Sequence, residues 1–160
     1  MRNPVPAVVR RVGTRPSLMR FEPVVVRLET AVRRLTRGRR GVLDLAGLPS
    51  VEVTAPGRRT GIPRTTALLY VPDADPDVVL LVGSNWGRPK HPAWSANLLV
   101  ADKAELHRRG DRFPVTVTPL DGPARDAAWQ RAVAFWPGYA MEQRMASHRP
   151  FRLFELRRSD

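Results

Sequence analysis

The chain contains no cysteine, few histidines and no long apolar run. Without cysteine it can form no disulfide, no thiolate metal site and no cysteine nucleophile. Its 3 histidines, His91, His107 and His148, stand in no ligand-like spacing, so no zinc site is expected. No stretch approaches the roughly 20 apolar residues of a spanning helix, and the N-terminus lacks the apolar core of a signal peptide. We expect a cytoplasmic protein, with peripheral contact at the inner face of the membrane as an option.

Acidic residues are also scarce, and the imbalance is concentrated at one end. The 160 residues, enough for one domain, carry a net charge of +12. Residues 1–40 hold eleven arginines against two glutamates, a net charge of +9, so the remainder is only mildly basic. This distribution predicts contact with something anionic: nucleic acid, acidic lipid or an acidic ligand tail.

An amphipathic helix is predicted for residues 23–36, at the end of this basic arm. Val25, Leu28, Val32 and Leu35 form one apolar stripe, and the arginines lie largely off it. Such a helix suits an interfacial membrane contact or, as the alternative, a cap on the folded body. We therefore divide the chain into a basic arm with this helix, residues 1–41, and a core domain, residues 42–160.

The most distinctive stretch is Gly57-Arg58-Arg59-Thr60-Gly61-Ile62-Pro63-Arg64. Runs of strand-forming residues flank it, at 51–54 and 65–71, so it reads as the turn of a β-hairpin. Three guanidinium groups at one turn repel each other unless an anion lies there, and arginine suits phosphate and carboxylate. A solvated basic turn is the alternative.

A second polar stretch follows the apolar strand predicted at 78–83. It runs through Ser84, Asn85, Trp86, Lys90 and His91 into a short helix that begins near Pro92. Loops at the ends of core strands commonly carry sites, and amides at a helix start can face an anion. Within the short helix Trp94 and Leu98 are expected to pack inward, and Asn97 lies beside them.

The rest of the chain predicts a second hairpin at 103–107 and 113–118, a helix at 123–136, a helical or looped stretch at 139–148, and a last strand at 151–156. Consecutive hairpins imply an antiparallel sheet, and this many strands in a small domain tend to close. The fold class is therefore α+β, mainly β: a single split β-barrel of about six antiparallel strands with flanking helices.

Three motifs in this order resemble the deazaflavin-dependent nitroreductase family of split β-barrel oxidoreductases: the arginine turn, Gly83-Ser84-Asn85-Trp86-Gly87, and His91-Pro92-x-Trp94-x-x-Asn97-Leu98. The resemblance covers roughly residues 42–157. It implies an enzyme, mostly actinobacterial, that transfers hydride from reduced coenzyme F-420 to a quinone, a nitro compound or an activated double bond.

The resemblance also implies roles for individual positions. Those assigned to the coenzyme are Arg58, Arg59, Thr60, Gly61, Arg64, Ser84, Asn85, Trp86, Lys90, His91, Pro92, Trp94 and Asn97. Arg59, supported by Arg64, would hold the coenzyme's phosphate and acidic tail, and Ser84 and Asn85 would lie against its ring. Better-studied members have lysine where Asn85 stands. Tyr139 would border the substrate, where the family often has several tyrosines.

Two other functions stay open at this point. The same barrel could bind FMN, or the chain could be a non-catalytic, arginine-rich module for acidic lipid or nucleic acid. Base-stacking aromatics do not interleave with the N-terminal arginines, so no specific nucleic-acid recognition is expected. We expect a small, lipophilic substrate and no metal, and the sequence leaves monomer and homodimer equally open.

Overall fold

The computed structural model describes residues 14, 17, 22–36, 41, 47–147 and 149–160. The sequence expectations for the basic arm ahead of residue 22 lie almost entirely outside the described residues, and so does His148. Within the part of the chain that is described, no helix is both long and apolar enough to cross a bilayer.

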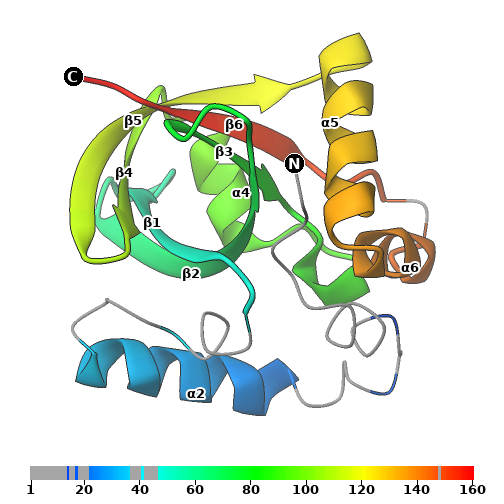
Figure 1. The fold of residues 1–160 in the computed structure, drawn as a ribbon, viewed down its shortest axis with the longest axis horizontal. Coiled ribbons are helices and arrows are strands. Elements are labelled where there is room, and N and C mark those ends of the chain that lie inside the picture. Colours follow the sequence, from blue (N-terminus) through cyan, green and yellow to red (C-terminus); the bar gives the residue numbers. More distant parts are fainter. Residues whose placement is uncertain (1–13, 15–16, 18–21, 37–40, 42–46, 148) are drawn as a thin grey trace.

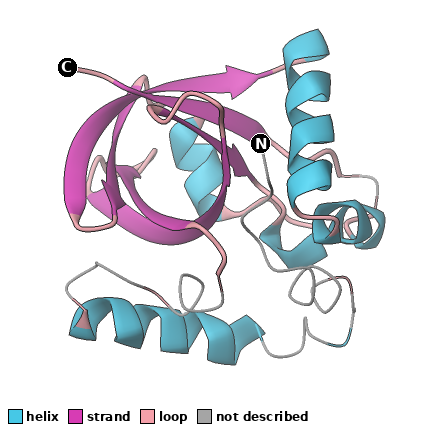
Figure 2. Cartoon of the chain, viewed as in Figure 1, coloured by secondary structure: helices cyan, strands magenta, loops and turns pink. Residues whose placement is uncertain are grey.

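Six antiparallel strands close into a barrel in the order β1-β2-β3-β6-β5-β4 (Figures 1 and 2). The strands are β1 (Ser50–Pro56), β2 (Pro63–Pro72), β3 (Val78–Val82), β4 (Lys103–Arg108), β5 (Asp111–Leu120) and β6 (Leu153–Arg158). The predicted barrel of antiparallel strands is confirmed. Three local hairpins, β1–β2, β2–β3 and β4–β5, supply half of the pairings, and the non-local β5–β6, β3–β6 and β1–β4 pairings complete the ring.

Two apolar clusters hold the barrel together. Alternating residues such as Val51 and Val53 of β1 point inward and pack with Val115 and Phe154 inside the barrel. All five residues of β3 are buried, because its outer face is also covered. The second cluster fills the space between that outer face and helices α5 (Gly122–Phe135) and α6 (Gly138–Met145).

A short helix, α4 (Ala93–Leu98), enters the barrel after β3. Leu98 is fully buried in the inner cluster, and the rings of Trp94 and Phe154 lie with their centroids 5.8 Å apart. The predicted inward packing of Trp94 and Leu98 is confirmed. The helix closes one end of the barrel, as Figure 1 shows.

The strand registers place both predicted site segments at this closed end, here called the loop end. Pro56 pairs with Pro63 at the arginine turn, and Val82 pairs with Leu153 where the polar loop leaves β3. The 83–102 connection and the start of α5 lie at the same end. The turns at 73–77 and 109–110 and the C-terminus of the chain therefore lie at the opposite, far end.

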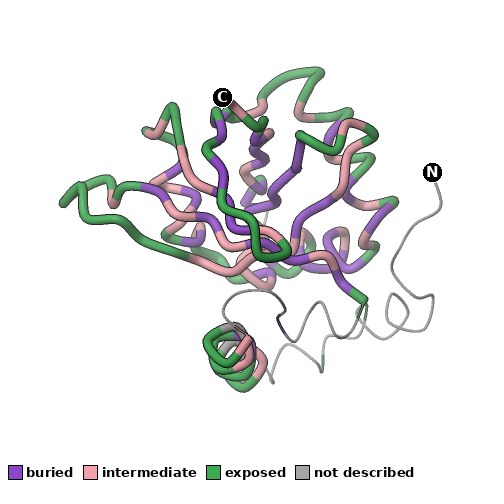
Figure 3. Tube along the Cα trace, turned by 60° about the vertical axis from the view of Figure 1, so that its left-hand side comes forward, coloured by how far each residue is buried: buried purple, intermediate pink, exposed green. Residues whose placement is uncertain are grey.

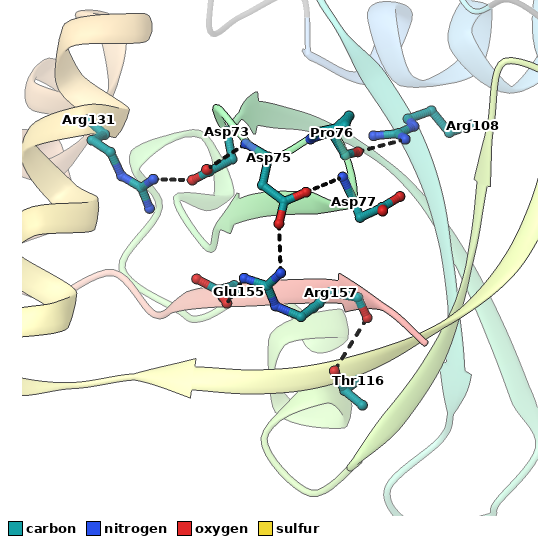
Figure 4. Close-up of polar contacts among 9 residues, drawn as sticks. All are labelled: Asp73, Asp75, Pro76, Asp77, Arg108, Thr116, Arg131, Glu155 and Arg157. Carbon is teal, nitrogen blue, oxygen red and sulfur yellow. Dashed lines mark hydrogen bonds and ion pairs between the residues drawn. The ribbon is translucent and has the colours of Figure 1, made fainter. Parts of the chain in front are cut away.

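The far end is fastened by ion pairs and turns (Figure 4). Arg157 pairs with Asp75 at 2.7 Å, and Arg131 of α5 pairs with Asp73. The carboxylates of Asp73 and Asp75 also accept backbone hydrogen bonds two residues on, which is the expected Asx-turn chemistry. These contacts tie the β2–β3 turn to β6 and α5.

The helix predicted at 23–36 is present as α2 (Glu22–Leu35), beside the barrel. Its apolar stripe is divided: Val25 and Val32 are half-buried, whereas Leu28 is 49% and Leu35 84% exposed. Glu29 is buried, the one such residue among those of this helix whose burial the structure describes, and its carboxylate lies against Gly41. Figure 3 shows the resulting mixture of exposed and half-buried turns.

Candidate functional site

The arginine turn is a tight, internally bonded loop with an outward-facing set of cations. Gly57 N–H donates to Ile62 O at 2.9 Å, and Gly61 N–H donates to Gly57 O at 2.7 Å. Gly61 has a φ of 68°, a conformation that glycine adopts without steric cost. Arg58, Arg59 and Arg64 are all exposed. None of the three has a carboxylate within ion-pair distance among the described residues.

Asn97 joins this turn to α4. Its Oδ1 accepts a hydrogen bond of 3.1 Å from the backbone N–H of Arg58. The structure thereby brings the first and third sequence motifs into contact. Asn97 and the inward-facing Trp94 therefore have structural roles: Asn97 positions the turn, and Trp94 packs on the core. Thr60 is likewise internal to the turn, because its hydroxyl accepts from Ile62 N–H at 3.3 Å.

The polar loop between β3 and α4 holds an unusual backbone conformation. Asn85, Trp86 and Gly87 have consecutive positive φ values of 51°, 58° and 71°. Such residues cost free energy and persist where surrounding contacts fix them. A Cβ on Gly87 would lie 2.9 Å from Glu142 O, so only glycine fits there. The Asn85 side chain closes the loop by donating to Lys90 O at 2.9 Å.

Arg149 supplies most of the contacts that fix this loop. Its guanidinium donates to Gly83 O at 3.1 Å, to Ser84 O at 2.7 Å and to Arg88 O at 2.9 Å. The side chain is only 8% exposed, and its charge lies 4.8 Å from the centroid of the Phe151 ring. The planar, five-donor guanidinium suits several carbonyls at once. Sequence reasoning missed this residue.

Glu142 of α6 backs the same loop from beneath. It is buried, and its Oε2 has no hydrogen-bond partner within the described residues. Burial raises the pKa of this carboxyl to about 7, against the opposing effects of hydrogen bonding to Ser84, the charge of Arg149 and hydrogen bonding to Trp136. A carboxyl group whose pKa lies near neutral pH is therefore next to Ser84.

His91 ends the loop in a defined electrostatic setting. Its Nδ1 lies 3.1 Å from Nη1 of Arg149. Burial lowers the pKa of the imidazole, and the charges of Arg152 and Arg149 lower it further. The side chain is therefore held neutral around physiological pH.

Tyr139 differs from its expected position. It is 3% exposed and lies in the outer apolar cluster, and burial, followed by the charge of Glu142, raises the pKa of its hydroxyl. The sequence interpretation placed it at a barrel mouth after Pro137 and Gly138. The stretch predicted after Pro137 and Gly138 is helix α6, and this helix packs the Tyr139 ring into the outer cluster with residues of α5. Tyr139 does not line an open site in this structure.

The comparisons with known proteins agree with this arrangement. The family model of the F420H(2)-dependent quinone reductases matches residues 25–153. The chain belongs to this family. An F420H(2)-dependent quinone reductase of Mycobacterium tuberculosis strain H37Rv is 36% identical over 108 residues, which cover 66% of this chain and 71% of the relative. The same figures apply to a relative from strain CDC 1551.

Solved structures show the same fold. A structure described as an F420-H2 dependent reductase, FDR-A, has 28% sequence identity and a TM-score of 0.59, over 68% of this chain and 93% of that one. A chain described as a domain-swapped dimer has 26% identity and a TM-score of 0.60, over 79% of the present chain and 97% of the solved one. The predicted split-barrel class is thus confirmed.

Proposed function

We propose that this family member reduces quinones with reduced coenzyme F-420 as the hydride donor. The observation that carries the proposal is the family match over residues 25–153, which includes a turn of three exposed arginines without carboxylate partners among the described residues. Coenzyme F-420 carries a phosphodiester and a glutamate tail, so it is strongly anionic. Arginine forks are the matching donors for both groups.

Some residues at the loop end would contact the coenzyme, and others would position the residues that do. Arg59, with Arg58 and Arg64, would bind its phosphate and acidic tail. Ser84, Asn85, Trp86 and Lys90 would line its ring, on the loop that Arg149 fixes. Gly61, Thr60 and Asn97 would act by holding the turn, and Pro92 and Trp94 by holding α4 in the barrel.

The coenzyme would supply the redox chemistry, because its deazaflavin carries hydride at one carbon. The chain's task is then to hold that carbon against the acceptor and to exclude water. A loop with fixed carbonyls and consecutive left-handed residues suits this task, since rigid positioning lowers the entropic cost of reaching the reactive geometry.

Quinone-dependent oxidation of reduced F-420 by the purified protein, followed by the coenzyme's absorbance, tests the function. We expect turnover with reduced F-420 and none with reduced FMN or a reduced nicotinamide at equal concentration. Turnover with FMN and no response to F-420 would overturn the coenzyme assignment and favour the FMN-binding alternative.

We further propose that α2 contacts an acidic membrane surface. Leu28 and Leu35 are exposed, and so are Arg27 and Arg34 of the same helix. Exposed leucines beside arginines fit an interface of apolar chains and anionic headgroups. Such a location would bring the enzyme to lipophilic quinones. The division into a basic arm, residues 1–41, and a core domain, residues 42–160, belongs to this proposal.

A further inference from the structure

A small cavity opens at the loop end, between the residue that follows α4, the end of β5, the first turn of α5 and the segment that leads into β6. Its volume is about 210 Å³. At about 30 Å³ per water in the liquid, this is room for roughly seven waters, the scale of one small ring and far less than a whole coenzyme. The wall is mainly apolar, with three nitrogen-bearing side chains in it. The lining includes His91, Leu99, Arg125, Phe151 and Arg152.

The geometry around His91 fixes which ring nitrogen carries its proton. The guanidinium of Arg149 has only donors, so Nδ1 of His91, 3.1 Å from Nη1, must be the acceptor. In the neutral ring the hydrogen is therefore on Nε2. Among the residues that the structure describes, none is hydrogen-bonded to Nε2. The imidazole thus offers one free N–H donor on the ring edge opposite Arg149.

Arg152 adds a fixed positive charge to the same cavity. Its Nη1 donates to Ser95 Oγ at 3.3 Å, and the hydroxyl of Ser95 in turn donates to Pro92 O at 2.8 Å. The guanidinium is therefore held in place by α4. Arg125 is a second guanidinium in the lining, held through its bond to Phe151 O. A neutral N–H donor and two held cations in a mainly apolar wall suit a planar molecule whose oxygen gains negative charge.

We propose that this cavity binds the carbonyl-bearing ring of the electron acceptor, and that Nε2–H of His91 donates a hydrogen bond to the acceptor's oxygen. The inference rests on the proposed quinone reduction and assigns its acceptor subsite. His91 closes the loop that carries Ser84, Asn85 and Lys90, so the cavity adjoins the segment proposed for the coenzyme ring.

The chemistry at the acceptor then balances simply. The C–H bond of the reduced coenzyme would break and an O–H bond would form at one quinone oxygen, while the charge passes through the ring and leaves the other carbonyl oxygen as a quinolate anion. That oxygen next takes a proton from solvent, matching the proton lost when the coenzyme becomes oxidised. His91 keeps its own proton throughout. It acts as a hydrogen-bond donor to the anion, beside the positive charge of Arg152.

Filling the cavity tests the acceptor site without touching the coenzyme's arginine turn. Leu99→Trp places a large ring in the cavity from a residue that is already 43% exposed, so the fold should tolerate it. We expect the KM for duroquinone to rise at least tenfold, with F-420 affinity within twofold of the parent. Val100→Trp is the matched control, because Val100 is exposed and does not line the cavity. It should leave both values unchanged.

A second measurement does not depend on the coenzyme. Nitrogen-15 NMR of the coenzyme-free protein should show His91 as the Nε2–H tautomer, and duroquinone should shift that resonance in the parent but not in Leu99→Trp. With 3 histidines in the chain, His91→Gln identifies the signal. An Nδ1–H tautomer, no shift, or a parental KM in Leu99→Trp overturns the inference. Loss of F-420 affinity in Leu99→Trp assigns the cavity to the coenzyme instead. If the parent fails to bind F-420 but duroquinone still shifts the His91 resonance, the proposed function is refuted and quinone binding in the cavity is not.

Discussion

At the scale of single residues, Arg149 carries the organisation of the site. Its guanidinium reaches Gly83 O, Ser84 O and Arg88 O, partners that lie more than 60 positions away in the sequence. The turn and loop motifs could be predicted because each is local and punctuated by glycine and proline. Arg149 and Glu142 could not, since an arginine before a strand and a glutamate on a helix carry no local sign of burial.

Arg149→Lys should loosen the loop while keeping its charge. One ammonium group cannot satisfy the three carbonyls that the guanidinium reaches. Losing hydrogen bonds to a charged group costs about 1.5–3 kcal/mol, so calorimetry should show a Tm lower by roughly 3–12 °C. F-420 affinity, measured by fluorescence titration, should fall at least fivefold.

Arg125→Lys is the matched control for that substitution. Arg125 also donates to a carbonyl near the cavity, Phe151 O, but it makes no contact with the 83–91 loop in the described structure. Its replacement should leave F-420 affinity within twofold. Equal losses of affinity in both variants would mean that Arg149 has no special role in positioning the loop.

Glu142 should make stability depend on pH. Its folded pKa of about 7 lies above the ordinary value of 4.5, so between these values the folded state binds more protons than the unfolded state. Stability should therefore fall as pH rises from about 4.5 to 7 and remain low above. The groups that face this carboxyl are Ser84, Trp136, Tyr139 and Arg149.

Glu142→Gln removes this titration. The difference in free energy of unfolding, variant minus parent, should rise by roughly 2.5 kcal/mol from pH 5 to pH 8, which urea unfolding at both values measures. Parallel curves for parent and variant across this range would show that Glu142 does not titrate there.

At the scale of elements, periodicity located the helices and strands but not every buried face. The alternation at 51–54 and the apolar run at 78–83 correctly predict strands β1 and β3, because the buried residues of a strand follow directly from such patterns. For α2 the pattern predicted one stripe, and the structure divides it. The reason is physical: the stripe defines which residues share a face, and only the tertiary partner determines whether that face is covered.

Leu28→Glu combined with Leu35→Glu tests the role of α2. Both side chains are exposed, so the Tm should change little, whereas carboxylates in place of leucines should oppose contact with anionic headgroups. Sedimentation with phosphatidylserine-containing vesicles should show binding at least tenfold weaker than that of the parent. Val100→Glu, an exposed apolar position outside α2, is the control. Equal vesicle binding by all three proteins would refute the proposed contact.

At the scale of the whole molecule, barrel closure is what assembles the site. The arginine turn follows β1 and the polar loop follows β3, and antiparallel pairing brings both to the loop end, where Asn97 of α4 bonds to the arginine turn. Hairpins were predictable from local turns. The β1–β4 and β3–β6 pairings that close the ring were not, because each joins strands more than 40 residues apart. The ion pairs of the far end hold the opposite rim without involving either motif.

Fluorescence titration of F-420 into the parent, Arg59→Ala and Arg109→Ala tests the central claim most directly. Arg109 is an equally exposed arginine at the far end, so its loss controls for net charge. The parent should bind F-420, and Arg109→Ala should match its affinity within twofold. Arg59→Ala should bind roughly 10- to 100-fold more weakly, because hydrogen bonds to charged groups contribute about 1.5–3 kcal/mol. Parental affinity in Arg59→Ala, or an equal loss in both variants, would contradict an anion-binding arginine turn.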